Sequence, residues 1–384
     1  HMLDSLLIKN FRSLENLEVP KLGRVNLMVG KNNSGKSTVL EALRLYAGNA
    51  QRPLLEAIAQ EHDERYRVRE SEALDAESLL PFQDFFPGRS FPMDGTAIEI
   101  GSGTSEDDRL QISHAMMEES IGEPELLEGE LINRIRRRYI RKFEADLFPG
   151  ELQQVILVRK GERLFPPVKL LNGARRSSAY DATSVPCSFI PTQFISMDEL
   201  ADEWDRIVFT EQEAVVKKAL LVIEPDFDNL TFVRADGYSP SGVRTRPSRT
   251  AMVKLKGVDR PVPLNSMGDG MLRVLQLALK LFAAKGGFLL IDEFENGLHY
   301  SVQEKVWGLL FEVAERHNIQ IFATTHSWDC IESFTKVAVA RTETDGVLFR
   351  LGRSVRTSDQ GRVIATVFDE AALQSITQQD VEVR

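Results

Sequence analysis

Short apolar runs that end in small, polar or acidic residues recur toward both ends of this chain. Runs of this length, bounded by turn-forming residues, are typical of buried strands. We predict strands at residues 7–9, 24–29, 188–196, 288–291 and 319–325. Apolar residues at helical spacing predict helices at residues 39–46, 197–207 and 271–284. Together these strands and helices indicate an α/β fold.

The middle of the chain lacks this pattern. Residues 51–185 are predicted to be an insertion between two halves of one head, residues 2–50 and 186–352, with residues 353–384 as a C-terminal tail. Within the insertion, Glu118–Asp146 is predicted to form a helical arm that is acidic in its first half and basic in its second. The basic side chains are Arg134, Arg136, Arg137, Arg138, Arg141 and Lys142. They form either a contact for the backbone of double-stranded DNA or a solvated face paired with the acidic half at i,i+4 spacing.

A glycine-containing segment, Gly30–Thr38, follows the strand at 24–29 and precedes the helix at 39–46. It reads G-x-x-x-x-G-K-S-T, the P-loop pattern in the context that the pattern requires, although a chance turn before a helix is the alternative. Its glycines let successive N–H groups turn inward and cradle a polyphosphate. Lys36 supplies charge to the β- and γ-phosphates, and the Ser37 hydroxyl is a ligand for Mg²⁺. The predicted nucleotide-binding residues are Gly30, Asn32, Asn33, Ser34, Gly35, Lys36, Ser37 and Thr38.

The strand at residues 288–291 ends in two carboxylates, Asp292 and Glu293. Ligands bind at the carboxyl ends of strands in sheets of this kind. We therefore predict that Asp292 holds Mg²⁺ through water and that Glu293 is the general base that polarises the attacking water. A strand end that enters a solvated turn is the alternative. Together with the P-loop, the pair predicts hydrolysis of ATP with Mg²⁺ as its cofactor.

Composition limits the cellular location and the partners that we expect for this protein. The chain has 384 residues and only two cysteines, Cys187 and Cys330, which lack the spacing of a metal site. No long uncharged apolar run is present, so we expect a cytoplasmic protein that does not engage a membrane. The formal net charge of −10 disfavours broad affinity for nucleic acid, although a dimer can still gather its basic residues on one face.

Two further segments resemble motifs of ABC-type ATPases. The segment at residues 264–270 is similar to a degenerate ABC signature, with Ser266 and Gly268 in place of its serine and first glycine. By this resemblance, Ser266 and the following helix N-terminus close over the nucleotide of a partner subunit, whereas an ordinary N-cap is the alternative. His326 ends the strand at 319–325, where ABC-type ATPases carry a histidine that contacts the γ-phosphate. A satisfied polar residue at a strand end is the alternative for His326.

The same resemblance suggests roles for three more residues. Residues 295–299 match the dimer-contacting loop of the ABC class, which makes Asn296 and His299 candidates for an interface. Gln193 is a candidate for the glutamine that senses Mg²⁺ in these sites, whereas a strand glutamine without any role at the nucleotide is the alternative.

The motifs GKNNSGKST, NSMGDGMLRVLQLAL, GGFLLIDEFENGLHYSVQ and FATTHSWDCI together resemble the ATPase part of the overcoming-lysogenization-defect (OLD) family. The opening strand followed by Asn-Phe-Arg-Ser is shared with RecF-like and SMC-like ATPases. The resemblance implies an ABC-ATPase-like P-loop head with a mixed β-sheet and a helical insertion. It also implies that Arg12 reaches a nucleotide phosphate, whereas a surface arginine that closes a turn is the alternative.

The resemblance also has a departure. OLD enzymes carry a C-terminal Toprim nuclease domain, and the residues after His326 are too few and lack the strand-end D-x-D of that fold. We therefore expect no intrinsic nuclease. By similarity to the ATPase component of bacterial antiphage defence systems, a separate Toprim-like or other effector protein is the expected partner.

The function implied is a dimeric switch in phage defence or DNA repair. ATP and Mg²⁺ close two heads into a head-to-tail homodimer, hydrolysis reopens it, and the output goes to DNA or to the effector. One alternative is an ATPase triggered by a protein partner without DNA contact, and another is a nucleotide-binding module with little turnover. A transporter subunit would carry a fuller L-S-G-G-Q, and a GTPase would need an Asn-Lys-x-Asp motif that this sequence lacks.

Overall fold

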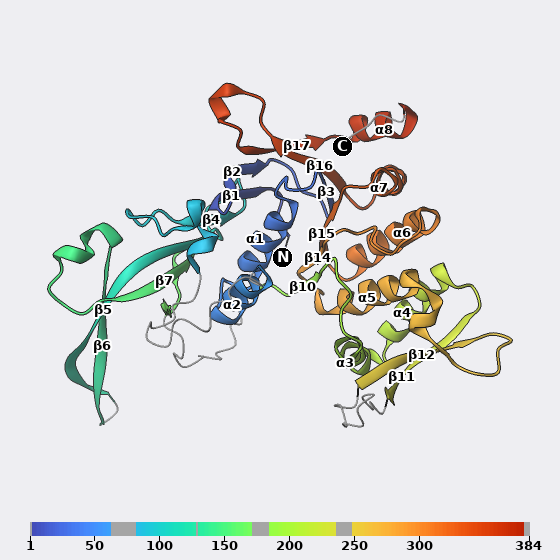
Figure 1. Ribbon diagram of the computed structural model, residues 1–384, viewed down its shortest axis with the longest axis horizontal. Coiled ribbons are helices and arrows are strands. Elements are labelled where there is room, and N and C mark those ends of the chain that lie inside the picture. Colours follow the sequence, from blue (N-terminus) through green and yellow to red (C-terminus); the bar gives the residue numbers. More distant parts are fainter. Residues whose placement is uncertain (1, 63–81, 128–129, 171–183, 236–247, 380–384) are drawn as a thin grey trace, which may run out of the picture.

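The computed structural model describes residues 2–62, 82–127, 130–170, 184–235 and 248–379 (Figure 1). A six-stranded sheet lies at its centre, with the strand order β10-β14-β15-β3-β16-β17. Its strands are β3 (Val25–Val29), β10 (Cys187–Ile190), β14 (Phe288–Ile291), β15 (Gln320–Thr325), β16 (Gly346–Arg353) and β17 (Val363–Phe368). The first five strands in this order run parallel and β17 pairs antiparallel at one edge, so the sheet is mixed as expected.

Each face of the central sheet is covered by a different layer. Successive side chains of a strand point to opposite faces, and Leu289 and Ile291 accordingly pack with the C-terminal helices. Leu290 and Phe322 pack on the other face, with α1 (Lys36–Ala47). The helices of the first face, drawn from green to red in Figure 1, are α3 (Met197–Ile207), α4 (Glu211–Ile223), α5 (Asp269–Ala283), α6 (Tyr300–Arg316), α7 (Trp328–Ala340) and α8 (Glu370–Gln379).

A second, antiparallel sheet covers α1 from the outside, and a third lies beside α3 and α4. The second contains β1 (Leu6–Phe11), β2 (Leu14–Val19), β4 (Ile98–Gly101), β5 (Leu110–Leu127), β6 (Glu130–Ile140), β7 (Gln153–Lys160), β8 (Arg163–Leu164) and β9 (Val168–Lys169). The third contains β11 (Phe227–Ala235), β12 (Ser248–Leu255) and β13 (Val262–Pro263). The short helix α2 (Arg52–Glu61) follows α1.

The α/β class and most of the predicted elements are confirmed. The strand predicted at 188–196 is too long, because β10 ends at Ile190 and a loop precedes α3. The predicted division into head, insertion and tail remains a prediction. Strands β4, β5 and β7 of the insertion continue the sheet that β1 and β2 begin, and residues 353–384 supply β17 and α8.

The predicted helical arm at Glu118–Asp146 is wrong. Most of this segment forms a long β-hairpin of β5 and β6, which projects away from the central sheet in Figure 1, and a short 3₁₀ helix at Lys142–Leu147 follows. The acidic and basic halves face each other across the strands, with Glu118 opposite Arg138 and Glu119 opposite Arg137. Cross-strand pairs of opposite charge stabilise a hairpin as i,i+4 pairs stabilise a helix, so charge pattern alone did not distinguish the two.

Across the residues that the structure describes, no helix combines the length and apolar character that a bilayer crossing requires.

Candidate functional site

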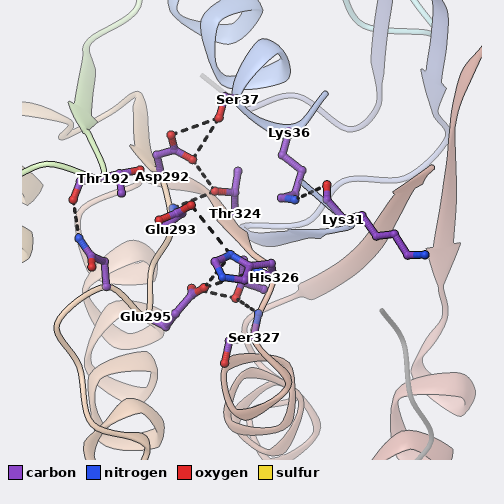
Figure 2. Close-up of polar contacts among 12 residues, drawn as sticks. Lys31, Lys36, Ser37, Thr192, Asp292, Glu293, Glu295, Thr324, His326 and Ser327 are labelled. Carbon is purple, nitrogen blue, oxygen red and sulfur yellow. Dashed lines mark hydrogen bonds and ion pairs between the residues drawn. The ribbon is translucent and has the colours of Figure 1, made fainter. Parts of the chain in front are cut away.

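Three parallel strands deliver the candidate residues to one edge of the central sheet. Strand β15 lies between β14 and β3, and its register places Ala323 opposite Ile291 and Thr325 opposite Val29. The carboxyl ends of parallel strands meet at the same edge. The P-loop after β3, the carboxylates after β14 and His326 after β15 therefore converge, as Figure 2 shows.

The P-loop has the backbone of an anion cradle. Gly35 adopts a left-handed conformation (φ 97°) that only glycine takes readily, and α1 begins there without a side-chain cap. The first-turn N–H groups of a helix attract anions. The Ser34 hydroxyl is buried and has no hydrogen-bond partner among the described atoms. Uncapped amides and an unsatisfied hydroxyl fit the phosphates of a nucleotide.

Lys36 is buried inside this loop. Its Nζ donates to the carbonyl of Gly30 at 2.5 Å and to that of Lys31 at 3.0 Å. Burial lowers the pKa of Lys36, and the charges of Asp292, Glu293 and Glu295 oppose that shift. The ammonium group is thus already held in the loop where the pattern places phosphates.

Asp292 and Ser37 form the candidate metal site. The Ser37 hydroxyl donates to Asp292 Oδ2 at 3.2 Å, and the Thr324 hydroxyl donates to Asp292 Oδ1 at 2.7 Å. A hydroxyl and a carboxylate are the hard oxygen donors that Mg²⁺ prefers, so the donor set fits this ion. The chain could hold Mg²⁺ between α1 and β14, directly or through bound water.

Glu293 lies in a strained turn immediately after β14. Its backbone is left-handed (φ 49°), an uncommon conformation for a residue with a side chain that costs of order 1 kcal/mol or more. The turn is held from both sides, because the Glu293 N–H donates to Thr324 Oγ1 at 2.8 Å and Arg273 Nη2 donates to the Glu293 carbonyl at 2.9 Å. The carboxylate itself stays about one-third exposed. A strained residue held in this way with an open carboxylate suits a catalytic base.

His326 lies beside two carboxylates. Its Nδ1 is 3.9 Å from Glu293 Oε1 and 3.5 Å from Glu295 Oε1 (Figure 2). Glu295 is fixed in turn, because Thr325 Oγ1 donates to its Oε2 at 2.8 Å. The imidazole is therefore oriented toward the turn at Glu293, and half of its side chain remains exposed.

The signature-like segment precedes α5 and is open to solvent. Gly268 is left-handed (φ 94°), and a Cβ added there would meet nothing within 4 Å. Ser266 is exposed and donates to the Pro263 carbonyl at 2.7 Å, and the N-cap position of α5 is Gly268, without a side-chain cap. Within the described residues, no hydrogen bond links Ser266 or Gly268 to the P-loop of the same chain.

Three other predicted residues, Gln193, Asn296 and His299, lie in the loops that follow β10 and β14. Gln193 is exposed in the loop after β10, the strand that pairs with β14. Asn296 donates through Nδ2 to the Thr192 carbonyl of that loop, and His299 is the N-cap of α6. Their roles in metal sensing and in an interface stay predictions.

Arg12 contacts residues of its own chain. Its Nε is 2.9 Å from Glu41 Oε2 on α1, and its guanidinium lies 5.1 Å from the centre of the Phe85 ring. The residue is left-handed (φ 52°) in the turn between β1 and β2. Its charge links this turn to the helix of the P-loop, and contact with a phosphate remains a prediction.

Sequence reasoning missed three residues of this site: Thr324, Glu295 and Arg273. Thr324 and Glu295 each lie within two residues of a residue that was predicted, and their side chains approach the site only because β14 and β15 are adjacent. Arg273 lies at a position of α5 that helical spacing assigns to the apolar face, and a charged residue there was the available signal.

We expect Thr324→Val to lower both the stability of the fold and the rate of ATP hydrolysis. The hydroxyl of the fully buried Thr324 joins Asp292 to the Glu293 N–H, and its loss leaves a buried donor without its partner. The free energy of unfolding should fall by about 1–3 kcal/mol in urea titrations. The kcat for ATP hydrolysis should fall roughly tenfold, equivalent to about 1.4 kcal/mol in the barrier.

Thr335→Val is the matched control for that variant. Thr335 is also buried, and its hydroxyl donates to the Ile331 carbonyl within α7 and to no other group in the part of the chain that the structure describes. Its replacement should leave kcat unchanged, and an equal loss of kcat in both variants would contradict a specific role for Thr324.

Two family profiles match this chain. One is described as an AAA ATPase domain and matches residues 2–110. The other is described as an AAA domain of the AbiEii toxin kind, from type IV toxin–antitoxin systems, and matches residues 162–329. The matched regions hold the P-loop and the Asp292-Glu293 pair, respectively.

Two curated relatives align along most of the chain. An ATP/GTP phosphatase of Helicobacter pylori is 24% identical over 362 residues, which are 88% of this chain and 88% of the relative. An OLD nuclease of Thermus scotoductus is 24% identical over 340 residues, which are 85% of this chain and 59% of the nuclease.

Solved structures of SMC heads are also similar. The SMC head bound to the C-winged helix domain of ScpA aligns with 97% of this chain and 100% of its own, with a TM-score of 0.47 and 16% identity. The SMC head domain from Thermotoga maritima covers 96% of this chain and 100% of its own, with a TM-score of 0.41 and 15% identity.

Proposed function

We propose that this chain, a P-loop ATPase of the ABC-like, OLD/SMC type, hydrolyses ATP between two copies of itself and uses the cycle as a switch. The observation that carries the proposal is the convergence of Lys36, Ser37, Asp292, Glu293 and His326 from separate segments at one edge of the sheet (Figure 2). A module that only bound nucleotide would have no use for a strained glutamate and a histidine beside it.

The chain's own residues divide the chemistry among them. Lys36 and the first turn of α1 bind and orient the β- and γ-phosphates. Mg²⁺, when bound at Ser37 and Asp292, neutralises charge that develops on the phosphate oxygens. Glu293 accepts a proton from the attacking water, whose oxygen forms the new bond to the γ-phosphorus as the bond to ADP breaks. His326 donates a hydrogen bond to a γ-phosphate oxygen.

The half-open site supports a dimer. Glu293 and His326 keep about one-third and one-half of their side chains exposed, whereas phosphoryl transfer works best where bulk water is excluded. Gly268 offers an open, uncapped helix N-terminus of the kind that binds phosphate. A head-to-tail homodimer matches the two surfaces, since Ser266 and Gly268 of one chain then cover the nucleotide of the other.

The first test is Mg²⁺-dependent release of phosphate from ATP by the purified chain, with and without linear duplex DNA. Glu293→Gln serves as the blank. Turnover that vanishes in the blank supports the proposed site, and turnover equal to the blank would overturn it. Gels of the same reactions show whether the DNA is cut, and we expect no cutting without a separate effector.

The hairpin supports double-stranded DNA as one regulator of the switch. Arg134, Arg136 and Arg138 alternate along β6 and therefore lie on one face. Arg137 points to the opposite face, where it pairs with Glu119 at 3.3 Å. Arg134 is itself 3.1 Å from Glu125, an exposed ion pair that contact with a phosphate would replace. A row of cations on a projecting strand can follow a phosphate backbone despite the net charge of the chain.

Charge reversal at Arg134, Arg136 and Arg138 should weaken duplex binding in low salt. Because three phosphate contacts are lost, the slope of log K against log salt should decrease by about 2.7. Fluorescence anisotropy with a labelled duplex measures both quantities. Reversal of three exposed lysines on the helical side, Lys218, Lys305 and Lys336, is the control. Equal effects in the two variants would contradict a specific contact.

A protein partner is the second candidate for the trigger, and the same hairpin favours it. The face of β6 opposite the three arginines carries Leu131 and Ile135, which are 70% and 59% exposed. Their cross-strand neighbours Leu126 and Ile121 are 72% and 79% exposed. ATP turnover that ignores DNA would favour this candidate, including a separate effector in phage defence or DNA repair.

A further inference from the structure

The buried arginine of α5 is the feature that the proposed mechanism leaves unused. Arg273 is fully buried, and its guanidinium donates to three backbone carbonyls outside its own helix. These are Pro191 at 3.1 Å, Asp292 at 2.9 Å and Glu293 at 2.9 Å. A single side chain thus joins α5, the turn at Asp292 and Glu293, and the loop that carries Gln193.

Burying the Arg273 guanidinium is an inefficient way to stabilise the folded state. Removing a cation from water is costly, and apolar residues of similar volume are often at least as stabilising. Burial lowers the pKa of Arg273 to about 10, and Glu295, Asp292 and Glu293 oppose the shift. Arg273 therefore stays charged near neutral pH, and a fixed planar fork is what distinguishes it from a packed apolar side chain.

Arg273 lies between the two nucleotide sites of the proposed dimer. The helix that carries it begins at Asp269, directly after Gly268, which faces the partner's nucleotide in the proposed dimer. Its acceptors include the carbonyl of Glu293, the strained residue that acts on the nucleotide of the same chain. Displacement of α5 at its N-terminus would reach Glu293 through these bonds.

We propose that Arg273 is a positioning residue that couples the two nucleotide sites of the dimer. Engagement of Ser266 and Gly268 by one nucleotide holds α5, and Arg273 then sets the turn that presents Glu293 to the other nucleotide. The proposal rests on the proposed ATPase function, and it assigns to Arg273 no contact with substrate.

Arg273→Met removes the fork and keeps an unbranched apolar side chain. The P-loop residues are untouched, so affinity for a fluorescent ATP analogue should stay within about twofold of wild type. We expect kcat per folded chain to fall by roughly 30-fold or more, and the Hill coefficient for ATP to fall to about 1. Arg273→Lys keeps the charge without the three-way fork and should restore only part of kcat. It also provides the test if Arg273→Met does not fold.

Gln276→Leu is the matched control. Gln276 lies one turn further along α5, is fully buried, and has no hydrogen-bond partner for either polar atom among the described residues. Its replacement changes a buried polar group of the same helix without touching the turn at Asp292 and Glu293. It should leave kcat and the Hill coefficient at wild-type values, and a loss of kcat here as large as that of Arg273→Met would overturn the assignment to Arg273.

Dimer formation separates this inference from the proposed function. Arg273→Met combined with Glu293→Gln should still dimerise in ATP, because the coupling acts after the heads meet. Loss of that dimer, while Glu293→Gln alone dimerises, would show that Arg273 only supports α5 and would overturn the inference. If Glu293→Gln alone stays monomeric, the dimeric function fails and the coupling fails with it. Arg273→Met with kcat within about threefold of wild type would overturn the inference while the ATPase function stands.

Discussion

Replacing Lys36 with alanine should reduce ATP affinity by roughly 100-fold or more. Charge-assisted hydrogen bonds contribute about 1.5–3 kcal/mol each, and Lys36 is placed to make them to two phosphates. Each 1.4 kcal/mol corresponds to about a tenfold change in the dissociation constant. Titration calorimetry with a non-hydrolysable ATP analogue and Mg²⁺ measures this directly.

Lys31→Ala is the control for the loss of charge in the same loop. Lys31 is exposed, and its side chain points away from Lys36 and the carboxylates in Figure 2. If electrostatic attraction to the loop in general explained binding, the two variants would lose similar affinity. A Lys36→Ala protein that binds ATP as well as Lys31→Ala would contradict the P-loop assignment.

The structure also explains why the free Lys36→Ala protein should remain folded. Among the described residues, the Lys36 ammonium donates to carbonyls of its own loop alone, Gly30 and Lys31, and these can turn to solvent or to main-chain donors. The apolar layers on either side of β3 do not depend on it. Circular dichroism of the variant should therefore match wild type, which keeps a loss of binding interpretable.

Sequence patterns predicted β3, β14 and β15 of the central sheet because these strands are buried on both faces, whereas the partly exposed β16 and β17 were not predicted. Such strands appear as continuous apolar runs, and the motif residues follow directly at their ends, as in Asp292 after Ile291. The alignment with an OLD nuclease at 24% identity supports the resemblance to the OLD family. Motif and strand lie next to each other in sequence here, so local reasoning sufficed.

The same reasoning failed where contacts join distant segments. Glu119 and Arg137 are partners in a hairpin, and their charges fit a helix equally well until strand pairing is known. Thr324 approaches Asp292 only because β15 is inserted next to β14. Arg273 donates to backbone carbonyls. Every residue has a backbone carbonyl, so the sequence does not show which residues will accept these hydrogen bonds.

Glu293→Gln should bind ATP normally and lose hydrolysis by about 100- to 10,000-fold, the range expected for loss of a general base. Glutamine keeps the size and the backbone of the strained turn, including the bonds from Arg273 and to Thr324. ATP should therefore accumulate in the site, and the heads should remain closed. We expect a dimer on a sizing column in ATP and a monomer without nucleotide.

Two further variants show whether that dimer is the proposed sandwich. Glu304→Gln removes the same charge from an exposed position of α6 and should hydrolyse ATP at the wild-type rate. Ser266→Arg, added to Glu293→Gln, places a bulky cation at the open segment before Gly268 and should abolish the dimer while each chain still binds ATP. Because Ser266 makes no hydrogen bond to its own P-loop among the described residues, loss of the dimer alone would indicate that it acts on a partner. A dimer that survives Ser266→Arg would exclude the head-to-tail arrangement, since the two heads would then meet through another surface and Glu293 would remain open to solvent.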